Sequence, residues 1–316
     1  MTLKFLHISD LHLSHKDNEI GFLEILEYYN SNNQNDELGI FTTYDSSKLD
    51  SLAKIIIEIG SQIDFIIITG DISSTSSEKD LKVSSQIITS TIEKIYDEDN
   101  NSLIPHPNIV MLPGNHDRLC IIKQSIPKLS MATNLNFETY FNTYWNPSHS
   151  QTKKIHYEAF KINEEKKVLF IKIDFSFTRD FVNICNIGKG NATQDILDEL
   201  EQGLSKISQD NSLIPFIMLH YSPLYDTSKD LILINRKKFI TLLEKYKIKY
   251  LFCGHTHSNE FKNYNSVKVI CSSSTLSSGN NKSRINILSY DLNTDVVEVE
   301  ESYYWRKNKY KFLKNF

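Results

Sequence analysis

Short, continuously apolar runs that stop at polar or charged residues most constrain the fold of this 316-residue chain. A run of roughly four to eight apolar and β-branched residues is typical of a strand covered on both faces of a sheet. The runs read KFLHISD, DFIIITGD, NIVMLPG, VLFIKID, PFIMLH and YLFCG, at residues 4–10, 64–71, 108–114, 168–174, 215–220 and 250–254. We expect each of them to form a buried strand.

Helical spacing of apolar residues lies between these runs. It predicts helices over residues 47–59, 78–95, 194–207 and 236–246. In the first of them, Ser47 and Asp50 suit a capping box at the helix start. Strands that alternate with helices predict an α/β fold. The strands expected at 267–271, 284–290 and 296–304 have no helix between them, so they predict a second, more antiparallel layer packed on the first sheet.

The domain organisation is expected to be simple, with one domain over residues 1–316. Two polar segments, 14–46 and 119–152, each follow one of the motifs described below. We interpret them as insertions or cap segments at the rim of a cleft, where loops usually carry specificity. In the second segment the aromatic residues recur at helical spacing, which favours core or cap packing over base stacking: Phe137, Tyr140, Phe141, Tyr144 and Trp145.

Composition narrows the partners. The net charge of −4 argues against general electrostatic coating of DNA, although it leaves a nucleic-acid substrate open. The 4 cysteines include no C-x-x-C pair, so neither a zinc knuckle nor a redox motif is indicated. No signal peptide and no apolar run of membrane-spanning length is visible. We therefore expect a cytoplasmic protein without a membrane partner; the sequence indicates no oligomeric state.

The residues that end the strands form a coherent chemical set. Ligands bind at the carboxyl ends of strands in open α/β sheets, so these side chains should converge. In chain order they are Asp10, His12, Asp71, Asn115, His116, Asp117, His220, His255 and His257. Carboxylate, imidazole and amide oxygen suit Mn, Zn, Fe or Ni, and the missing thiolate disfavours a structural zinc site.

This set holds too many candidate ligands for one four-coordinate ion, and suits two ions that share a carboxylate. Two ions about 3.5–4 Å apart would clamp a phosphoryl group and generate a bridging hydroxide that attacks phosphorus in line with the leaving group. His116 remains over from the ligand count. We expect it to protonate the leaving oxygen, with Asp117 hydrogen-bonded to its ring to fix the tautomer.

The order of these residues resembles the calcineurin-like metallophosphoesterase family, in the branch of prokaryotic phosphodiesterases and repair nucleases. The pattern D-x-H, G-D, G-N-H-D, H, G-H-x-H stands here as Asp10-Leu11-His12, Gly70-Asp71, Gly114-Asn115-His116-Asp117, His220 and Gly254-His255-Thr256-His257. The resemblance implies a four-layer α-β-β-α sandwich with two central mixed sheets and a metal site at the carboxyl ends of the strands. It assigns Asp10, His12, Asp71 and His257 to a first metal, and Asp71, Asn115, His220 and His255 to a second.

Departures from the subfamilies narrow the activity. The stretch after Gly70 lacks the D-x-x-D-R-G continuation of protein phosphatases, and Ser74 stands where purple acid phosphatases have a tyrosine ligand. Leu13 and Ser14 replace the glycine that usually follows D-x-H in the nucleases. These features favour a phosphodiesterase acting on a cyclic nucleotide or another nucleotide or sugar diester. It would use two divalent ions, manganese before iron, zinc or nickel. The alternatives are a DNA or RNA nuclease with the same chemistry, and a catalytically silent scaffold.

Three further residues lie close to the motifs. Arg118 follows the G-N-H-D motif and is open to two interpretations, steering of a phosphate or pairing with a carboxylate. His15 lies near the D-x-H motif and could reach a substrate. His7 lies inside the first strand, where a hydrogen-bonded core residue is expected rather than a ligand.

Overall fold

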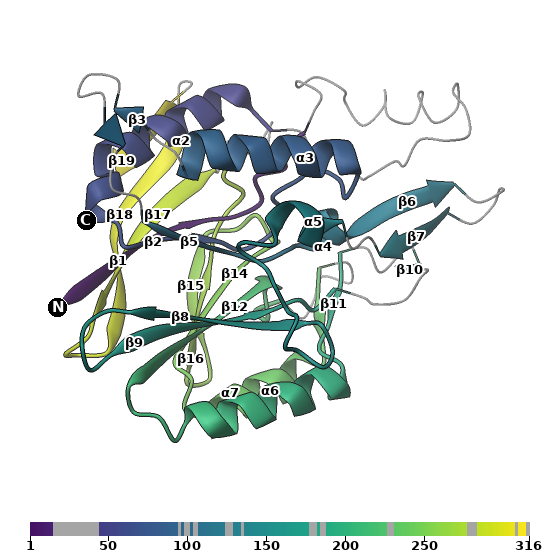
Figure 1. Cartoon of the computed structure of the whole chain (residues 1–316), viewed down its shortest axis with the longest axis vertical. Coiled ribbons are helices and arrows are strands. Elements are labelled where there is room, and N and C mark those ends of the chain that lie inside the picture. Colours follow the sequence, from purple (N-terminus) through teal and green to yellow (C-terminus); the bar gives the residue numbers. More distant parts are fainter. Residues whose placement is uncertain are drawn as a thin grey trace.

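The computed structural model describes residues 1–14, 44–93, 96–97, 102–103, 107–123, 129–133, 136–176, 182–183, 188–225, 231–276, 283–306 and 309–313. Two six-stranded sheets face each other at its centre (Figure 1). The first has the order β19-β18-β17-β1-β2-β5 and the second β15-β16-β14-β12-β9-β8. In the first sheet the parallel strands β1, β2 and β5 lie at one end, and the other strands pair antiparallel. In the second sheet the parallel pairs lie in the middle and both edge pairs are antiparallel, so both sheets are mixed.

The strands of the first sheet are β1 (Thr2–Ile8), β2 (Phe65–Ile68), β5 (Asn108–Met111), β17 (Arg284–Asp291), β18 (Val296–Arg306) and β19 (Lys309–Leu313). Those of the second are β8 (Ile155–Lys161), β9 (Lys167–Ile173), β12 (Leu213–Tyr221), β14 (Tyr250–Gly254), β15 (Glu260–Tyr264) and β16 (Val267–Cys271). The β2 strand is buried at every position, as its unbroken FIII run predicts.

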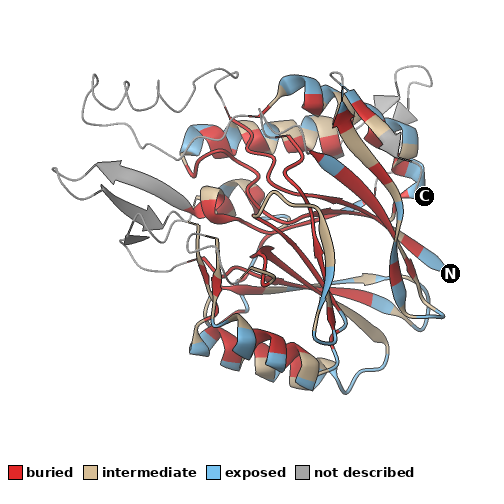
Figure 2. Ribbon diagram, turned by 180° about the vertical axis from the view of Figure 1, so that it is seen from behind, coloured by how far each residue is buried: buried red, intermediate tan, exposed pale blue. Residues whose placement is uncertain are grey.

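Helices cover the outer faces of both sheets (Figure 1). The first sheet carries α2 (Ser46–Ile59) and α3 (Glu78–Ile87), which continues as a π-helical turn over Ile88–Glu93. The second carries α6 (Gln194–Ile207) and α7 (Arg236–Lys245). In Figure 2 the buried side of each helix faces its sheet. The predicted four-layer α-β-β-α sandwich with two central mixed sheets is therefore confirmed.

Smaller elements complete the described chain. They are the 3₁₀ turn Gly60–Gln62, the short helices α4 (Asn115–Arg118) and α5 (Phe137–Phe141), the three-stranded sheet of β6 (Leu119–Lys123), β7 (Leu129–Thr133) and β10 (Val182–Asn183), and the pairs β3 (Tyr96–Asp97) with β4 (Ser102–Leu103) and β11 (Gly190–Asn191) with β13 (Leu233–Ile234). The sheet of β6, β7 and β10 projects from the body of the molecule beside α4 (Figure 1).

Aromatic rings fill the space between the two sheets. Phe5 of β1 lies 5.4 Å from Phe216 and 5.9 Å from Phe252, both in the second sheet, measured between ring centroids. Large rings bury much apolar area per residue, and tilted or edge-on contacts at these distances are favourable. This packing holds the two sheets together below the edge where their parallel strands end.

The order of the late strands differs from the sequence-based expectation. Only β16 belongs to the second sheet, whereas β17 and β18 extend the first sheet antiparallel to β1. Periodicity reports that a segment is a strand, but its partner depends on which sheet edge is free. Helix α2 also begins earlier than expected, because the carboxylate of Asp45 accepts from the Ser47 backbone N–H at 2.9 Å and caps the helix in place of Ser47.

The two predicted insertions have different outcomes. In the first, residues 15–43 lie outside the described residues. In the second, Phe137, Phe141 and Trp145 are buried in the core, as their spacing predicts, so this part is built into the body of the fold. The assignment of one domain with two rim segments stays a prediction. No helix in the described ranges combines the length and apolar character needed to cross a membrane.

Candidate metal centre

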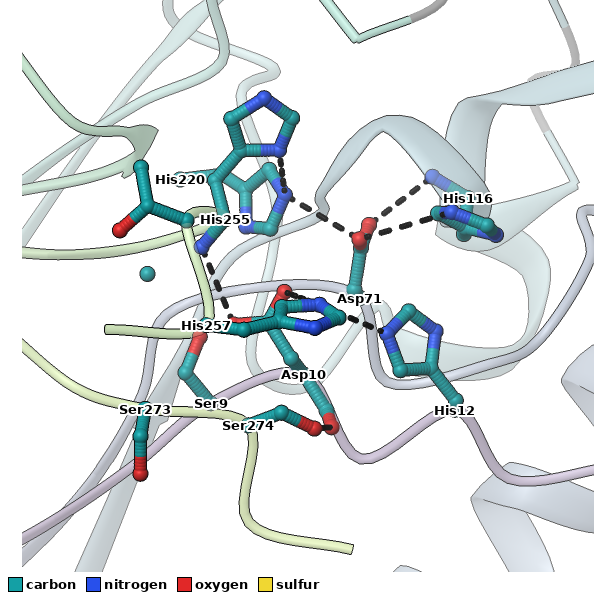
Figure 3. A network of polar contacts seen from close by, with 12 residues as sticks. Ser9, Asp10, His12, Asp71, His116, His220, His255, His257, Ser273 and Ser274 are labelled. Carbon is teal, nitrogen blue, oxygen red and sulfur yellow. Dashed lines mark hydrogen bonds and ion pairs between the residues drawn. The ribbon is translucent and has the colours of Figure 1, made fainter. Parts of the chain in front are cut away.

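Strand ends from both sheets bring the predicted residues to one place. Asp10 and His12 follow β1, Asp71 follows β2, and Asn115 begins α4 after β5. From the second sheet, His220 is the last residue but one of β12, and His255 and His257 follow β14. Figure 3 shows the carboxylates and imidazoles pointing toward one another from these separate loops. The expectation that the strand ends converge is met.

The backbone at these positions is strained. Ten described non-glycine residues have positive φ, and five of them are candidate ligands: Asp10, His12, Asp71, His255 and His257, with φ of 52°, 50°, 50°, 73° and 53°. The left-handed region costs a non-glycine residue about 1 kcal/mol or more. Glycine would remove this strain but would carry no donor atom. The fold thus holds donor side chains in a conformation that glycine would adopt more easily.

The glycines of the motifs allow the strand ends to approach closely. A Cβ on Gly114 would lie 2.2 Å from Asp71 Oδ1, and one on Gly254 would lie 1.9 Å from Ser9 Oγ and 2.7 Å from Asp10 Oδ2. Any side chain at either position would therefore displace a candidate ligand. This contact is the physical reason for glycine before Asn115 and before His255.

The donor atoms form two groups. In the first, His12 Nε2 lies 3.4 Å from His257 Nε2, which lies 3.3 Å from Asp10 Oδ1. In the second, His220 Nε2 lies 3.2 Å from Asp71 Oδ2, 3.0 Å from Asn115 Oδ1 and 3.1 Å from His255 Nδ1. Asp71 also lies within 4.8 Å of donors from His12 and His116, and so stands between the two groups.

These spacings fit bound divalent ions. Metal–ligand bonds of about 2.1 Å place neighbouring ligand atoms roughly 3.0–3.4 Å apart in octahedral or tetrahedral geometry, which matches the separations above. Asp10 Oδ1 is buried 3.3 Å from His257 Nε2 but accepts no hydrogen bond within the described part of the chain, an arrangement that is costly unless another partner binds it. The mixed oxygen and nitrogen donors fit metal ions in both groups, and this buried oxygen adds to the fit of the first group.

Backbone groups orient the second set of imidazoles. His220 Nδ1 donates to the Thr69 carbonyl at 2.8 Å, and His255 Nε2 donates to the Gly188 carbonyl at 2.6 Å. A carbonyl can only accept, so each bond fixes the tautomer and leaves the other ring nitrogen free to face the cluster. The carboxylates are held similarly, since the His255 N–H donates to Asp10 Oδ2 at 3.0 Å and the His116 N–H to Asp71 Oδ1 at 2.9 Å.

The electrostatics leave the cluster rich in electron-pair donors. Burial would raise the pKa of the Asp71 carboxyl, but the neighbouring His220 and His116 outweigh it and hold that pKa well below its usual range. Burial opposes charge on His220 too, yet Asp71 raises its pKa to about 10. For His12 and His255, burial lowers the pKa to about 3. Two imidazoles are thus neutral at pH 7, and an ion that binds His220 displaces a proton.

His116 lies beside the cluster, partly open to solvent. Its Nε2 is 3.9 Å from Asp71 Oδ2, and 12% of its side chain is exposed. Its Nδ1 donates to the Ser74 carbonyl at 2.8 Å, which fixes the ring and turns Nε2 toward the cluster. The expectation that Asp117 holds this ring is wrong. Adjacent side chains on a helix point about 100° apart, so Asp117 turns away from His116.

Asp117 instead ties the motif loops together. Its carboxylate accepts from the backbone N–H groups of Ile72, Ser73 and Gly114 at 3.1, 2.8 and 2.9 Å, and from the Ser73 hydroxyl at 2.7 Å. It therefore fixes the loop after Gly-Asp against the loop before Asn115. Burial, together with the charge of Asp71, raises its pKa.

Arg118 does not face the cluster, so the phosphate-steering interpretation is wrong and the carboxylate-pairing one is correct. Its side chain is 2% exposed and binds Asp174 and Glu138. His15 lies outside the described residues. His7 is a buried core residue, as expected, with Nε2 3.1 Å from Thr69 Oγ1.

Several residues at the site were not anticipated. Asp174 follows β9 directly, so the strand-end rule that found the candidate ligands also points to it. The Tyr221 ring packs against the imidazoles of His220 and His255, at centroid distances of 5.2 and 5.0 Å. Ser274 Oγ donates to the Asp10 carbonyl at 2.9 Å and supports the strained loop. The serine-rich stretch around Ser274 has no pattern that would have revealed this role.

Comparison with known proteins gives a consistent result. A sequence model of the family "calcineurin-like phosphoesterase" matches residues 3–259. No curated protein sequence matches significantly. A dimetal phosphatase from Danio rerio shares the fold, with a TM-score of 0.54 and 11% identity over 90% of this chain and 92% of its own. The GAP50 anchor of the Plasmodium inner membrane complex aligns at a TM-score of 0.49 and 10% identity, over 99% of this chain and 90% of its own.

The family match covers most of the sequence and includes every motif residue from Asp10 to His257. The same residues gather at the strand ends of a four-layer sandwich and form the His/Asp groups described above. The likeness to the Danio rerio phosphatase shows the fold alone, and the sequence match supplies the family. This chain belongs to the calcineurin-like phosphoesterase family.

Proposed function

We propose that this protein hydrolyses phosphodiesters with the help of two divalent metal ions. Family membership supports the broader statement, a metal-dependent phosphoester hydrolase. The observation that carries the proposal is the position of Asp71 between two donor groups, with the His116 ring directly beside it. A shared carboxylate flanked by a free imidazole suits a reaction in which one side activates water and the other releases an alcohol.

In this proposal Asp10, His12, Asp71 and His257 hold one ion, and Asp71, Asn115, His220 and His255 hold the other. The bound ions would supply electrophilic activation of the phosphoryl group and an acidified water. The oxygen and imidazole donors suit manganese first, with iron, zinc or nickel as alternatives. Buried donors and fixed tautomers hold the site ready for loading.

His116 is proposed as the general acid. Its Nδ1–H stays bonded to the Ser74 carbonyl, so the ring can act as an acid only as the imidazolium, which delivers its Nε2 proton to the leaving oxygen. Its partial exposure places it where a substrate can reach it. Cleavage of a nucleoside or sugar diester releases an alkoxide, a poor leaving group that depends most on this proton.

The charge balance favours a diester over a monoester. A diester carries one negative charge on the phosphate, whereas a monoester carries up to two and needs more cationic help. Arg118 is the cation closest to His116 in sequence, and its guanidinium is already engaged by Asp174 and Glu138. We therefore propose a small nucleotide or sugar diester as the substrate class.

The proposal is tested by hydrolysis of bis-p-nitrophenyl phosphate and p-nitrophenyl phosphate by metal-stripped protein, with and without added Mn²⁺. We expect activity only with metal, and a higher kcat/KM for the diester. Cyclic nucleotides and oligonucleotides would then be compared, and a strong preference for oligonucleotides would identify a nuclease. Two bound ions with no turnover of any ester would overturn the proposal in favour of a silent scaffold.

A further inference from the structure

A buried cluster of charges lies next to the candidate metal centre and faces away from it. Arg118 Nε donates to Asp174 Oδ2 at 2.9 Å, and its two terminal nitrogens donate to the two Glu138 oxygens at 2.7 Å each. Lys154 Nζ donates to the same Asp174 oxygen at 3.1 Å. The Arg118 guanidinium also lies 5.5 Å from the Phe137 ring and 6.0 Å from the Trp145 ring. Carboxylates and aromatic rings thus fix this guanidinium in one orientation.

The cluster joins the two sheets at the level of the site. Arg118 is the last residue of α4, which continues from β5 of the first sheet and begins with Asn115 and His116. Asp174 follows β9 of the second sheet. A four-residue helix cannot hold its own orientation, because one turn is too short for a stable helix. The ion pair therefore anchors the far end of the turn that presents His116.

The same carboxylate supports the opposite side of the site. Asp174 Oδ1 accepts from the Ser176 N–H at 2.8 Å, and the Ser176 hydroxyl lies 3.1 Å from the Tyr221 hydroxyl. The Tyr221 ring then packs against His220 and His255. Asp174 is thus connected through Arg118 to the helix of His116, and through Ser176 and Tyr221 to the imidazoles of the second donor group.

Stability alone does not account for such a cluster. Buried ion pairs cost much desolvation, and replacing them with apolar side chains is often neutral or stabilising. Arg118 and Asp174 are 2% and 1% exposed, so the full desolvation cost applies. The ion pair instead fixes the direction and distance between two loops, which an apolar contact would not specify.

We propose that Arg118 and Asp174 are positioning residues that set the orientation of His116 relative to the second donor group. The proposal rests on the proposed role of His116 for its catalytic consequence, but not for its structural one. Small displacements of a catalytic group cost rate steeply, up to about 10²-fold for about 1 Å. Weakening this pair should therefore impair proton delivery more than it impairs folding or metal binding.

The central experiment compares Arg118→Met with a matched control, Lys172→Met. Lys172 lies on β9, two residues before Asp174, is fully buried, and pairs with Glu158 at 2.7 Å. Both substitutions remove one buried cation, which pairs with two carboxylates for Arg118 and with one for Lys172. Only Arg118 belongs to the helix that carries His116. Rates are measured for two diesters, one with a p-nitrophenyl leaving group and one with an alkyl leaving group.

We expect Arg118→Met to slow the alkyl diester about 10-fold to 10²-fold more than the p-nitrophenyl diester. Lys172→Met should leave that ratio at the wild-type value. A loss of stability alone would reduce the rates for both esters equally. Equal losses in Arg118→Met would overturn the proposal.

A second readout needs no catalysis. In metal-free protein, the ¹⁵N chemical shifts of the His116 ring report which nitrogen carries the proton. The neutral ring of the wild type should be a single Nδ1–H tautomer, set by the Ser74 carbonyl, whereas Arg118→Met should give a mixture of the two neutral tautomers. An unchanged His116 spectrum in the variant would overturn the proposal. If the wild type cleaves no ester, the proposed function fails, while this measurement still decides the positioning role.

Milder variants cover the case in which Arg118→Met does not fold. Arg118→Lys keeps a cation near Asp174 but loses the two-pronged bond to Glu138, so it should show part of the leaving-group effect. Glu138→Gln alters only the outer, 31% exposed partner and should show less. A wild-type leaving-group ratio in Arg118→Lys, with the Glu138 bonds lost, would also contradict the proposal.

Discussion

The two donor groups of the candidate centre differ in enclosure and support. The group of Asp10, His12 and His257 opens to solvent at His257, whose side chain is 33% exposed. In the other group His220 is fully buried. The imidazoles of His220 and His255 are each fixed by a backbone carbonyl, whereas the buried Nδ1 of His12 has no hydrogen-bond partner among the residues that the structure describes. We therefore expect the enclosed group to bind a metal ion tightly, and the open group to exchange its ion and admit substrate.

Asp71 belongs to both groups, so its loss should have the largest effect. Asp71→Ala is expected to lose both ions and to reduce kcat/KM by about 10³-fold or more, because metal activation is worth several kcal/mol. Metal content is measured by elemental analysis after dialysis, alongside the rate. Asp71→Asn is the matched control for size, and should retain more metal than the alanine variant. Full occupancy by two ions in Asp71→Ala would refute the shared role.

His116 lies at the open side, and its loss should affect chemistry and spare binding. We expect His116→Ala to keep both metals and to slow the alkyl diester by about 10²–10⁴-fold, the usual contribution of a general acid. The effect should be much smaller with a p-nitrophenyl leaving group, which departs without a proton. A uniform loss on both substrates would show that His116 has another role.

The difference between the groups predicts two metal affinities. Hydrogen-bond partners that orient the metal ligands commonly change metal affinity by about 10–100-fold. Among the described residues, the enclosed group has such partners on both of its imidazoles, and the open group does not. Mn²⁺ titration of metal-free protein by calorimetry should therefore resolve a tight and a weak site about 10–100-fold apart. His257→Ala should remove the weak site and His220→Ala the tight one. The reverse assignment would contradict the proposed difference in affinity between the enclosed and the open group.

The carboxylate of Asp174, linked to the enclosed group through Ser176 and Tyr221, should give a smaller effect that depends on pH. Burial would raise its pKa, but Lys154 and Arg118 outweigh it and lower the pKa of its carboxyl to about 2 from 3.8. A depressed folded-state pKa stabilises the protein above the unfolded value, and this contribution is lost as pH falls from about 4 to about 2. The shift of about two units corresponds to about 2.5 kcal/mol.

The measurement is denaturant unfolding of wild type and Asp174→Asn at several pH values. The difference in unfolding free energy should be constant above about pH 4.5 and shrink between about pH 4 and 2. A difference that does not change with pH would mean that the carboxylate of Asp174 is not the titrating group.

Much of this arrangement could be predicted from the sequence, because the features that determine it are local in the chain. Buried strands and amphipathic helices follow from runs and spacing, and the convergence of Asp10, Asp71 and His220 follows from parallel strands ending at one edge. Partners of individual side chains do not follow. The ring of His116 bonds to the Ser74 carbonyl and not to Asp117, because that choice depends on which way a single helical turn faces.

Long-range pairing was equally inaccessible. β17 and β18 join the first sheet because β1 has a free edge there, a fact about the assembled fold and not about their own residues. The internal pairing of Arg118 depends on Glu138 and Asp174, 20 and 56 residues away in sequence. Motif spacing identified the candidate ligands, but only the fold shows what supports them.

The left-handed backbone of the candidate ligands has a consequence for how such a protein changes over generations. A substitution that discards a ligand can also release strain, so losing the metal site can be stabilising. His257, which is 33% exposed and has a φ of 53°, is the clearest case. The unfolding free energy of His257→Gly, measured by denaturant titration, should exceed that of His257→Ala by about 1 kcal/mol. Mutations that turn an active hydrolase into an inert binding protein would then increase folding stability. Selection for catalytic activity alone would retain the ligands.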